Sequence, residues 1–157
     1  MKKEGKACTF IGHRKIEESD GLVKRVEEEI ERLIEEEGVE LFLFGSKSEF
    51  DALCLKTVTR LKGKYPHIKR IYVRAEFPYI NESYERYLLE RYDSTFFPEK
   101  ILKAGRYAYV ERNALMIDES DFCVFYYKKN ENYTKKSGTK IAYEYALKRD
   151  TTVINLF

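Results

Sequence analysis

The sequence has little cysteine: Cys8, Cys54 and Cys123 are the only three among its 157 residues, and no two of them form a CxxC pair. An odd number without metal-ligand spacing argues against a disulfide framework and against a structural zinc site. Each cysteine lies in an apolar segment, which predicts buried free thiols in a reducing compartment. We therefore expect no metal and no cofactor.

A clear excess of one charge is also absent. The chain carries 29 basic and 27 acidic residues, a formal net charge of +2. Without a strongly basic surface, we do not expect a nucleic-acid partner. The apolar run at residues 7–11, behind the basic first residues, is too short for a signal peptide or a membrane span. These absences predict a cytoplasmic protein without a membrane partner.

The sequence also has only three prolines and eight glycines, and no segment resembles a linker. It does have 13 tyrosines and 10 phenylalanines, which is too aromatic for a disordered chain. A domain of about 150 residues buries roughly two-thirds of the surface that its unfolded chain exposes, enough for a core without disulfides or metal. We predict a single domain over residues 1–157.

Short β-like runs alternate with amphipathic helical patterns along the chain. Apolar runs predict strands at residues 7–11, 40–44, 70–73, 122–127 and 152–156. Helical spacing predicts helices at about 19–38, 50–61, 81–92 and 107–118, and from Ser137 onward. Residues 93–100 are expected to form a turn and residues 128–136 a polar loop. The alternation is typical of the Rossmann-like α/β class, with a mainly parallel sheet of about five strands and helices on both faces.

In such a sheet, ligands bind outside the carboxyl ends of the strands, near the point where the strand order reverses. The candidate binding residues are those that directly follow the strands, namely Gly12, His13, Arg14, Gly45, Ser46 and Arg74. Glycine lets a ligand approach the backbone closely, and the two arginines would converge on one rim with forked donors suited to phosphate. The alternatives are that the glycines only end strands, that His13 is structural, and that the arginines form surface ion pairs.

The segment Ser137-Gly138-Thr139 begins a helix after the loop that follows a buried strand. The free N–H groups and the dipole of a helix start form an anion site. The alternative is that Ser137 or Thr139 only caps the helix. The sequence leaves both interpretations open.

Two further groups of residues have a functional and a structural interpretation. Arg112 and Asn113 lie on the helix before the strand at 122–127, where Arg112 suits a salt bridge as well as a ligand contact. An aromatic helix face is more often core, but aromatic rings in the middle of the chain could stack on a base. The tyrosines concerned are Tyr79, Tyr84, Tyr87 and Tyr92.

Four motifs together resemble the SLOG superfamily of Rossmann-like proteins, which includes the Smf/DprA proteins and the LOG enzymes. They are TFIGHRK at 9–15, FGSKSEFD at 44–51, RNALMIDESD at 112–121 and SGTKIAYEYALKRDTTVINL at 137–156. The likeness runs nearly end to end and is strongest to the small stand-alone YpsA-like and YoqJ-like proteins of bacteria and phages.

The resemblance implies a phosphorylated nucleotide or nucleotide-derived ligand that lies across residues 12–14, 45–46 and 137–139. Arg112 and Asn113 would approach this ligand, and Asp51 of the second motif is a further candidate contact. Members of the superfamily divide between hydrolases that split a nucleoside monophosphate and sensors of nucleotide-derived signals, some of them in antiphage defence. Because dimers are common among these relatives, a homodimer is also expected.

The sequence departs from the LOG-type catalytic motif GGxGTxxE. Ala142 stands where that motif has its glutamate, and Glu144 is rotated by about 200° around the helix. We therefore favour a ligand-binding module: a sensor, a carrier or a protein that sequesters a nucleotide signal. The alternative is an N-glycosidic-bond hydrolase that uses another acid, such as Glu76 or Asp51. A DNA-associated role, by analogy with the Smf/DprA proteins, fits poorly with the near-neutral charge.

Overall fold

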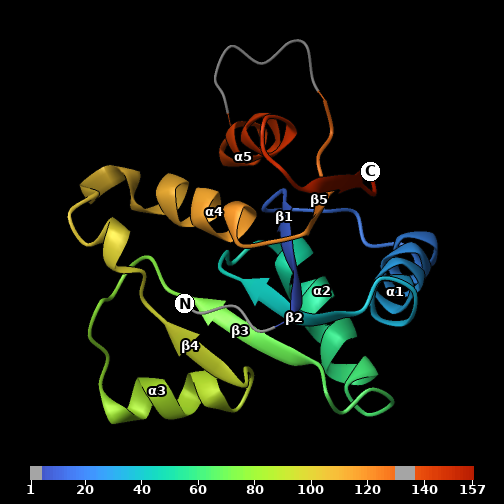
Figure 1. Ribbon diagram of the computed structural model, residues 1–157, viewed down its shortest axis with the longest axis horizontal. Helices are drawn as coiled ribbons and strands as arrows, with labels where there is room; N and C mark the ends of the chain where they lie inside the picture. Colours follow the sequence, from blue (N-terminus) through green and yellow to red (C-terminus); the bar gives the residue numbers. More distant parts are fainter. Residues whose placement is uncertain (1–4, 130–136) are drawn as a thin grey trace.

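The computed structural model describes residues 5–129 and 137–157, in which strands and helices alternate (Figure 1). The strands are β1 (Lys6–Gly12), β2 (Val39–Phe44), β3 (Lys69–Val73), β4 (Ser94–Phe96), β5 (Phe122–Tyr126) and β6 (Thr152–Asn155). The helices are α1 (Asp20–Glu35), α2 (Glu49–Leu61), α3 (Glu82–Leu89), α4 (Ala108–Asp118) and α5 (Gly138–Leu147). Most of the loop predicted at 128–136 lies outside the described residues. No helix within the described ranges is long and apolar enough to cross a membrane.

The six strands form one sheet in the order β4-β3-β2-β1-β5-β6, and every neighbouring pair is parallel. The chain builds the sheet outward from β1 to β4 and then returns to the other side of β1 for β5 and β6. The strand order therefore reverses between β1 and β5, which is where open α/β sheets bind ligands. This arrangement confirms the predicted Rossmann-like α/β class.

The turn predicted at residues 93–100 is wrong in part, because Ser94–Phe96 forms the short edge strand β4. It pairs with β3 in the register Ile71↔Ser94 to Val73↔Phe96. Asp93 positions the strand by accepting the Arg70 N–H and the Arg70 guanidinium, at 2.8 and 3.1 Å. A three-residue strand carries too little alternation to be recognised in the sequence, so β4 depends on these tertiary contacts.

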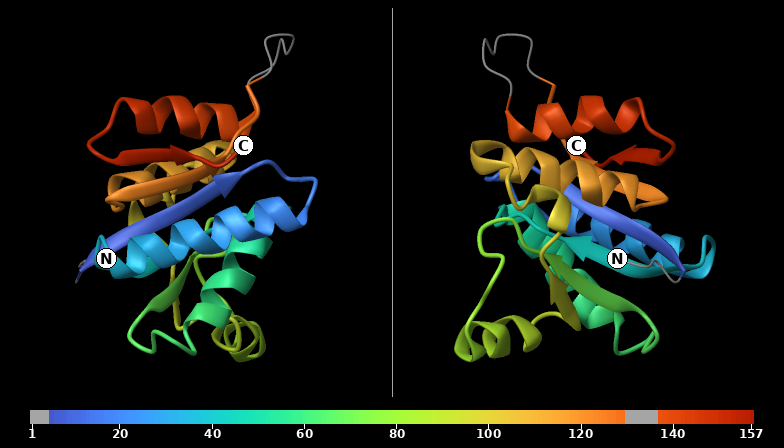
Figure 2. Two further views of the ribbon diagram at one scale, coloured as in Figure 1. Left: turned by 90° about the vertical axis from the view of Figure 1, so that its right-hand side faces the viewer. Right: turned by 60° about the vertical axis from the view of Figure 1, so that its left-hand side comes forward.

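Two layers of helices cover the two faces of the sheet (Figure 2). Side chains of a strand alternate between faces, so Phe42 and Phe44 of β2 pack with residues of α1 and α2. Leu41 and Leu43 point the other way and pack with residues of α4 and α5. Because both faces are buried, the carboxyl edge of the sheet is where loops and helix starts meet solvent.

Candidate functional site

A cleft of about 510 Å³ lies at the carboxyl ends of the central strands and the start of α5. Most residues that the sequence singled out line it together, although they come from four separate segments of the chain. They are Gly12, His13, Arg14, Gly45, Ser46, Arg112, Asn113, Ser137, Gly138 and Thr139. Two other predicted residues, Asp51 and Arg74, are not part of its lining.

The glycines at the ends of β1 and β2 are required by the protein's own packing. A Cβ on Gly12 would lie 2.5 Å from the Phe50 ring, and a Cβ on Gly45 would lie 2.7 Å from Cδ of Arg112. Both distances are far below van der Waals contact. The close approach that needs glycine here is therefore made by two side chains of the chain itself, which leaves less room for a ligand ring over these positions.

Arg112 connects the loops that follow β2 and β3. It is only 3% exposed, and its guanidinium donates to the carbonyl of Gly45, more weakly to that of Val73 at 3.4 Å, and to Oδ1 of Asn113 at 3.1 Å. Burial lowers the pKa of Arg112, and the nearby Asp51 charge opposes that effect. Its cationic head thus forms part of the cleft floor in a fixed position.

Asp51 holds the loop between β2 and α2. Its Oδ2 accepts the N–H groups of Gly45 and Ser46 at 3.3 and 3.1 Å, and its own N–H donates to Ser48 Oγ at 3.0 Å. The side chain is only 3% exposed. Burial raises the pKa of Asp51 to about 7, although these N–H groups and Arg112 favour its charged form.

The start of α5 opens onto the cleft. Ser137 caps the helix, since its Oγ accepts the Lys140 N–H at 3.1 Å. The first N–H groups of a helix have no acceptor inside the helix, and the Ser137 hydroxyl takes only one of them. Among the described residues, a Cβ on Gly138 would have nothing within 4 Å, and Ser137, Gly138 and Thr139 all line the cleft. The capping interpretation is correct, and it is compatible with an anion at the same helix start.

His13 joins the ends of β1 and β5. Its Nε2 accepts the Lys128 N–H at 2.8 Å, and its ring centre lies 5.8 Å from that of Tyr127. Partial burial lowers the pKa of His13, and the Lys128 charge lowers it further. The imidazole is therefore a neutral acceptor with a positioning role. Within residues 5–129 and 137–157, no group of histidine, cysteine or acidic residues is arranged to hold a metal ion.

The two arginines expected at one rim have different environments. Arg14 is exposed, and no side chain in the described part of the protein pairs with its guanidinium. Arg74 instead donates to the carbonyls of Phe77 and Pro78 and to Thr95 Oγ1, at 3.1, 3.3 and 3.2 Å. The structure thus brings Arg14 to the cleft and keeps Arg74 in the loop after β3.

Five residues of the cleft lining were not among the predicted binding residues: Ile11, Lys47, Ser48, Glu76 and Tyr109. Tyr109 donates its hydroxyl to Oε1 of Glu76 at 3.1 Å, and Lys47 Nζ lies 3.6 Å from Oε2. Glu76 follows β3 by three residues, a position that the strand-end rule could have included. Tyr109 has no comparable signal in the sequence, because only the packing of α4 brings it to this edge.

The fold and the cleft define an open, parallel α/β domain with a polar site where its strand order reverses. The family model described as the YspA SLOG family matches residues 12–156, so the chain belongs to this family. A search of curated proteins found no match.

Proposed function

We propose that this cleft binds the phosphate of a nucleotide or nucleotide-derived ligand, and that the protein acts as a sensor, a carrier or a sequestering module for it. The observation that supports this most is that the start of α5 lines the same cleft as Arg14, whose guanidinium has no partner among the described residues. Helix N-termini attract anions because their free N–H groups and the helix dipole act together.

Three cations among the described residues line the cleft together with the start of α5, and they differ in exposure and in their partners. Arg112 is buried and fixed by two backbone carbonyls. Lys47 lies near Glu76, which balances part of its charge. Arg14 is exposed at the rim and can move onto a bound anion, where a charge-assisted hydrogen bond is roughly twice as strong as a neutral one. The ligand phosphate would thus meet a rigid floor and a mobile rim.

The hydrolase alternative depends on one carboxylate of the cleft. Ala142, at the position of the LOG-type glutamate, is buried in the core with Ala146 and offers no acid. Glu76 does line the cleft. Its carboxylate accepts the Tyr109 hydroxyl and lies 3.6 Å from Lys47 Nζ, and a carboxylate held in a cleft can act as a general base. Chromatography of each bound compound distinguishes the two functions, since only a hydrolase would release a base and a sugar phosphate.

Substitution of Gly138 tests the phosphate site. In Gly138→Asp, a carboxylate would stand at the helix start, where it stabilises the helix and repels phosphate. Gly138→Ser is the neutral control and adds a smaller side chain at the same position, where a Cβ meets no atom of the described residues within 4 Å. The probes are nucleoside mono- and diphosphates, ADP-ribose and cyclic dinucleotides in a thermal-shift screen, because a ligand that binds only the folded state raises the melting temperature.

We expect at least one of these compounds to stabilise the wild-type protein and Gly138→Ser, and none to stabilise Gly138→Asp. The unliganded melting temperature of Gly138→Asp should match or exceed that of Gly138→Ser, which excludes misfolding. If the same compound stabilises all three proteins equally, the phosphate does not lie at the start of α5 and the proposal fails.

A further inference from the structure

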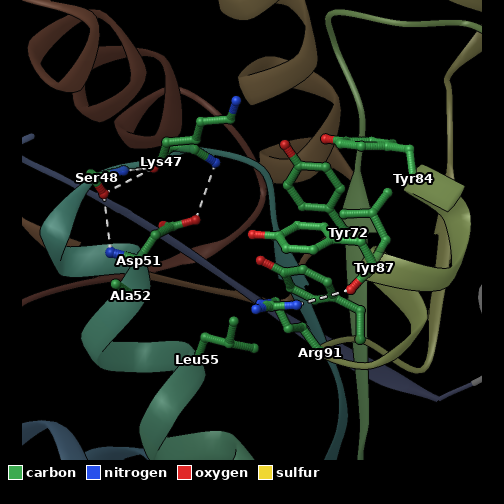
Figure 3. Close-up of a pocket in the computed structure, with 12 residues that line it drawn as sticks. Lys47, Ser48, Asp51, Ala52, Leu55, Tyr72, Tyr84, Tyr87 and Arg91 are labelled. Atoms are coloured by element: carbon green, nitrogen blue, oxygen red, sulfur yellow. Dashed lines mark hydrogen bonds between the residues drawn. The ribbon is translucent and has the colours of Figure 1, made fainter. Parts of the chain in front are cut away.

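A second, smaller pocket of about 200 Å³ adjoins the cleft (Figure 3). It lies between the start of α2, the strand β3 and the helix α3. The segment 46–48 lines both the cleft and this pocket, so it forms the boundary between them. Single-ligand pockets usually have about 300–1,000 Å³. A space of this size therefore suits one ring system of a ligand whose remainder lies elsewhere.

Four tyrosines form the walls of this tyrosine pocket: Tyr72, Tyr84, Tyr87 and Tyr92. The rings of Tyr72 and Tyr92 lie 5.0 Å apart, and those of Tyr84 and Tyr87 lie 6.0 Å apart and nearly parallel. Tyr92 also packs on Phe44 of the sheet, at 5.9 Å. Because the sheet supports the rings of Tyr72 and Tyr92, this side of the pocket presents aromatic surface without prior rearrangement.

Several polar atoms of the tyrosine pocket have no hydrogen-bond partner among the described residues. None of the four tyrosine hydroxyls has a hydrogen bond to another residue in the described ranges. Oδ1 of Asp51, at the same pocket, is buried and also has no partner there. Figure 3 shows the Tyr72 hydroxyl directed toward the Asp51 carboxylate across the pocket. Buried polar groups are normally satisfied, so the unpartnered Asp51 Oδ1 and the hydroxyl of the buried Tyr72 point to an absent partner.

The charges around the tyrosine pocket favour a neutral planar ring over a cation. Tyrosines beside a carboxylate can form a cage for cations. The Arg91 guanidinium, however, already lies 3.9 Å from the centre of the Tyr87 ring and donates to the Tyr87 carbonyl at 3.1 Å. A second cation would be repelled by this guanidinium. Burial raises the pKa of Tyr72 to about 12, so its hydroxyl stays a neutral donor and acceptor near physiological pH.

We propose that the tyrosine pocket receives the heteroaromatic base of the ligand, which stacks on the tyrosine rings with its polar edge toward their hydroxyls and Asp51. The ligand would then cross the segment 46–48 into the cleft, where its phosphate binds. The phosphate half of this inference rests on the proposed function, whereas the base pocket can be tested without it. The inference also explains where the base lies, since Phe50 and Arg112 already occupy the space over Gly12 and Gly45.

Two substitutions perturb the tyrosine pocket in opposite ways. Tyr84→Leu removes one ring of its wall, and Ala52→Phe places a ring into its mouth from an exposed position on α2. Tyr79→Leu is the matched control, because Tyr79 is 87% exposed and lines neither the cleft nor the tyrosine pocket. Thermal unfolding confirms that each variant folds.

Isothermal titration with nucleoside 5′-monophosphates and with ribose 5-phosphate measures the contribution of the base. We expect the best monophosphate to bind the wild-type protein and Tyr79→Leu about fivefold or more tightly than ribose 5-phosphate does, since stacking of one base on aromatic rings contributes at least this much. Tyr84→Leu and Ala52→Phe should lose that advantage and keep the affinity for ribose 5-phosphate. In saturation-transfer NMR with the phosphate-free nucleosides, we expect the base protons to contact the wild-type protein and Tyr79→Leu. We expect no such contact with Tyr84→Leu or Ala52→Phe.

The outcomes separate the two proposals. If ribose 5-phosphate binds as tightly as every monophosphate, or if the advantage of the base persists in both pocket variants, the base pocket is refuted and the phosphate site stands. If nucleosides contact the intact pocket but Gly138→Asp leaves monophosphate affinity unchanged, the base pocket stands and the phosphate site fails. If no nucleoside and no phosphate compound binds, both are refuted.

Discussion

A single buried carboxylate, Asp51, organises the loop between the cleft and the tyrosine pocket. It accepts the N–H groups of Gly45 and Ser46 on one oxygen and has no partner for the other in the described part of the chain. Burial of a carboxyl group disfavours its charged form, which is why the pKa of Asp51 rises to about 7. The ionisation of this one residue therefore affects both the stability of the fold and the polarity of the tyrosine pocket.

The raised pKa of Asp51 predicts that its ionisation destabilises the protein as the pH rises. The folded protein keeps the proton up to about pH 7, whereas the unfolded chain releases it near pH 4. Between these values the folded state binds more protons than the unfolded chain. The free energy of unfolding therefore falls by up to about 1.4 kcal/mol for each unit by which the pH rises. Relative to Asp51→Asn, the wild-type free energy of unfolding should fall from pH 4 to 7 and level off above. Urea denaturation across this range measures the difference, and a constant difference would contradict the assignment.

At the scale of elements, the cleft lies at the carboxyl ends of the parallel strands. The arginines that follow strands β1 and β3 nevertheless have different roles. Arg14 follows β1 at the point where the strand order reverses, and it borders the cleft. Arg74 follows β3, one strand from the edge, and fastens the loop at residues 77–78 to Thr95 next to β4. The position of a strand within the sheet thus decides whether an arginine at its end borders the cleft.

Arg14→Ala and Arg74→Ala should consequently affect different properties. Loss of a charge-assisted hydrogen bond in Arg14→Ala should weaken phosphate-ligand binding about tenfold, with little change in melting temperature. Arg74→Ala should lower the free energy of unfolding by about 1–3 kcal/mol and leave affinity unchanged. Calorimetric titration and thermal unfolding of both variants check this, with Arg14→Lys as the control that retains the charge. Equal losses of affinity in both variants would show that the rim includes Arg74.

At the scale of the whole molecule, the helices of both layers exclude solvent from the three cysteines. Cys8 lies on β1, Cys54 on α2 and Cys123 on β5, and all three are free and buried, as predicted. Burial raises the pKa of each thiol, that of Cys123 to about 11. The thiolate is the reactive form of cysteine, so these residues should react only when the domain opens. The predicted homodimer, the cytoplasmic location and the antiphage role remain predictions.

Thiol reactivity therefore reports opening of the whole domain. In native buffer, Ellman's reagent should label the protein slowly, and in denaturant it should label three thiols per chain at once. The native rate should follow the free energy of global unfolding and slow further with a bound ligand. Dithiothreitol should leave the melting temperature unchanged, because no disulfide links these residues. Rapid native labelling of any one thiol would show that its part of the sheet opens locally.

The sequence by itself determined the class of fold and most of the strand and helix order. Strands that are buried on both faces of the sheet appear in the sequence as continuous apolar runs, and helices appear as a regular apolar spacing. Both patterns are local and can be recognised without knowledge of distant contacts. It also indicated which strand ends and which helix start line the cleft. These positions follow from the chirality and parallel order that the alternating pattern imposes.

Only the tertiary structure decided what the individual side chains do there. Strand β4 exists through its pairing with β3, and the direction of Arg74 depends on a loop that no local pattern specifies. Gly12 and Gly45 are glycines because Phe50 packs against the first and Arg112 against the second. Both partners are distant in the sequence. The four tyrosines form a pocket because β3 and α3 come together beside α2. Contacts between distant segments are set by packing of the whole core, and periodicity along the chain contains no record of them.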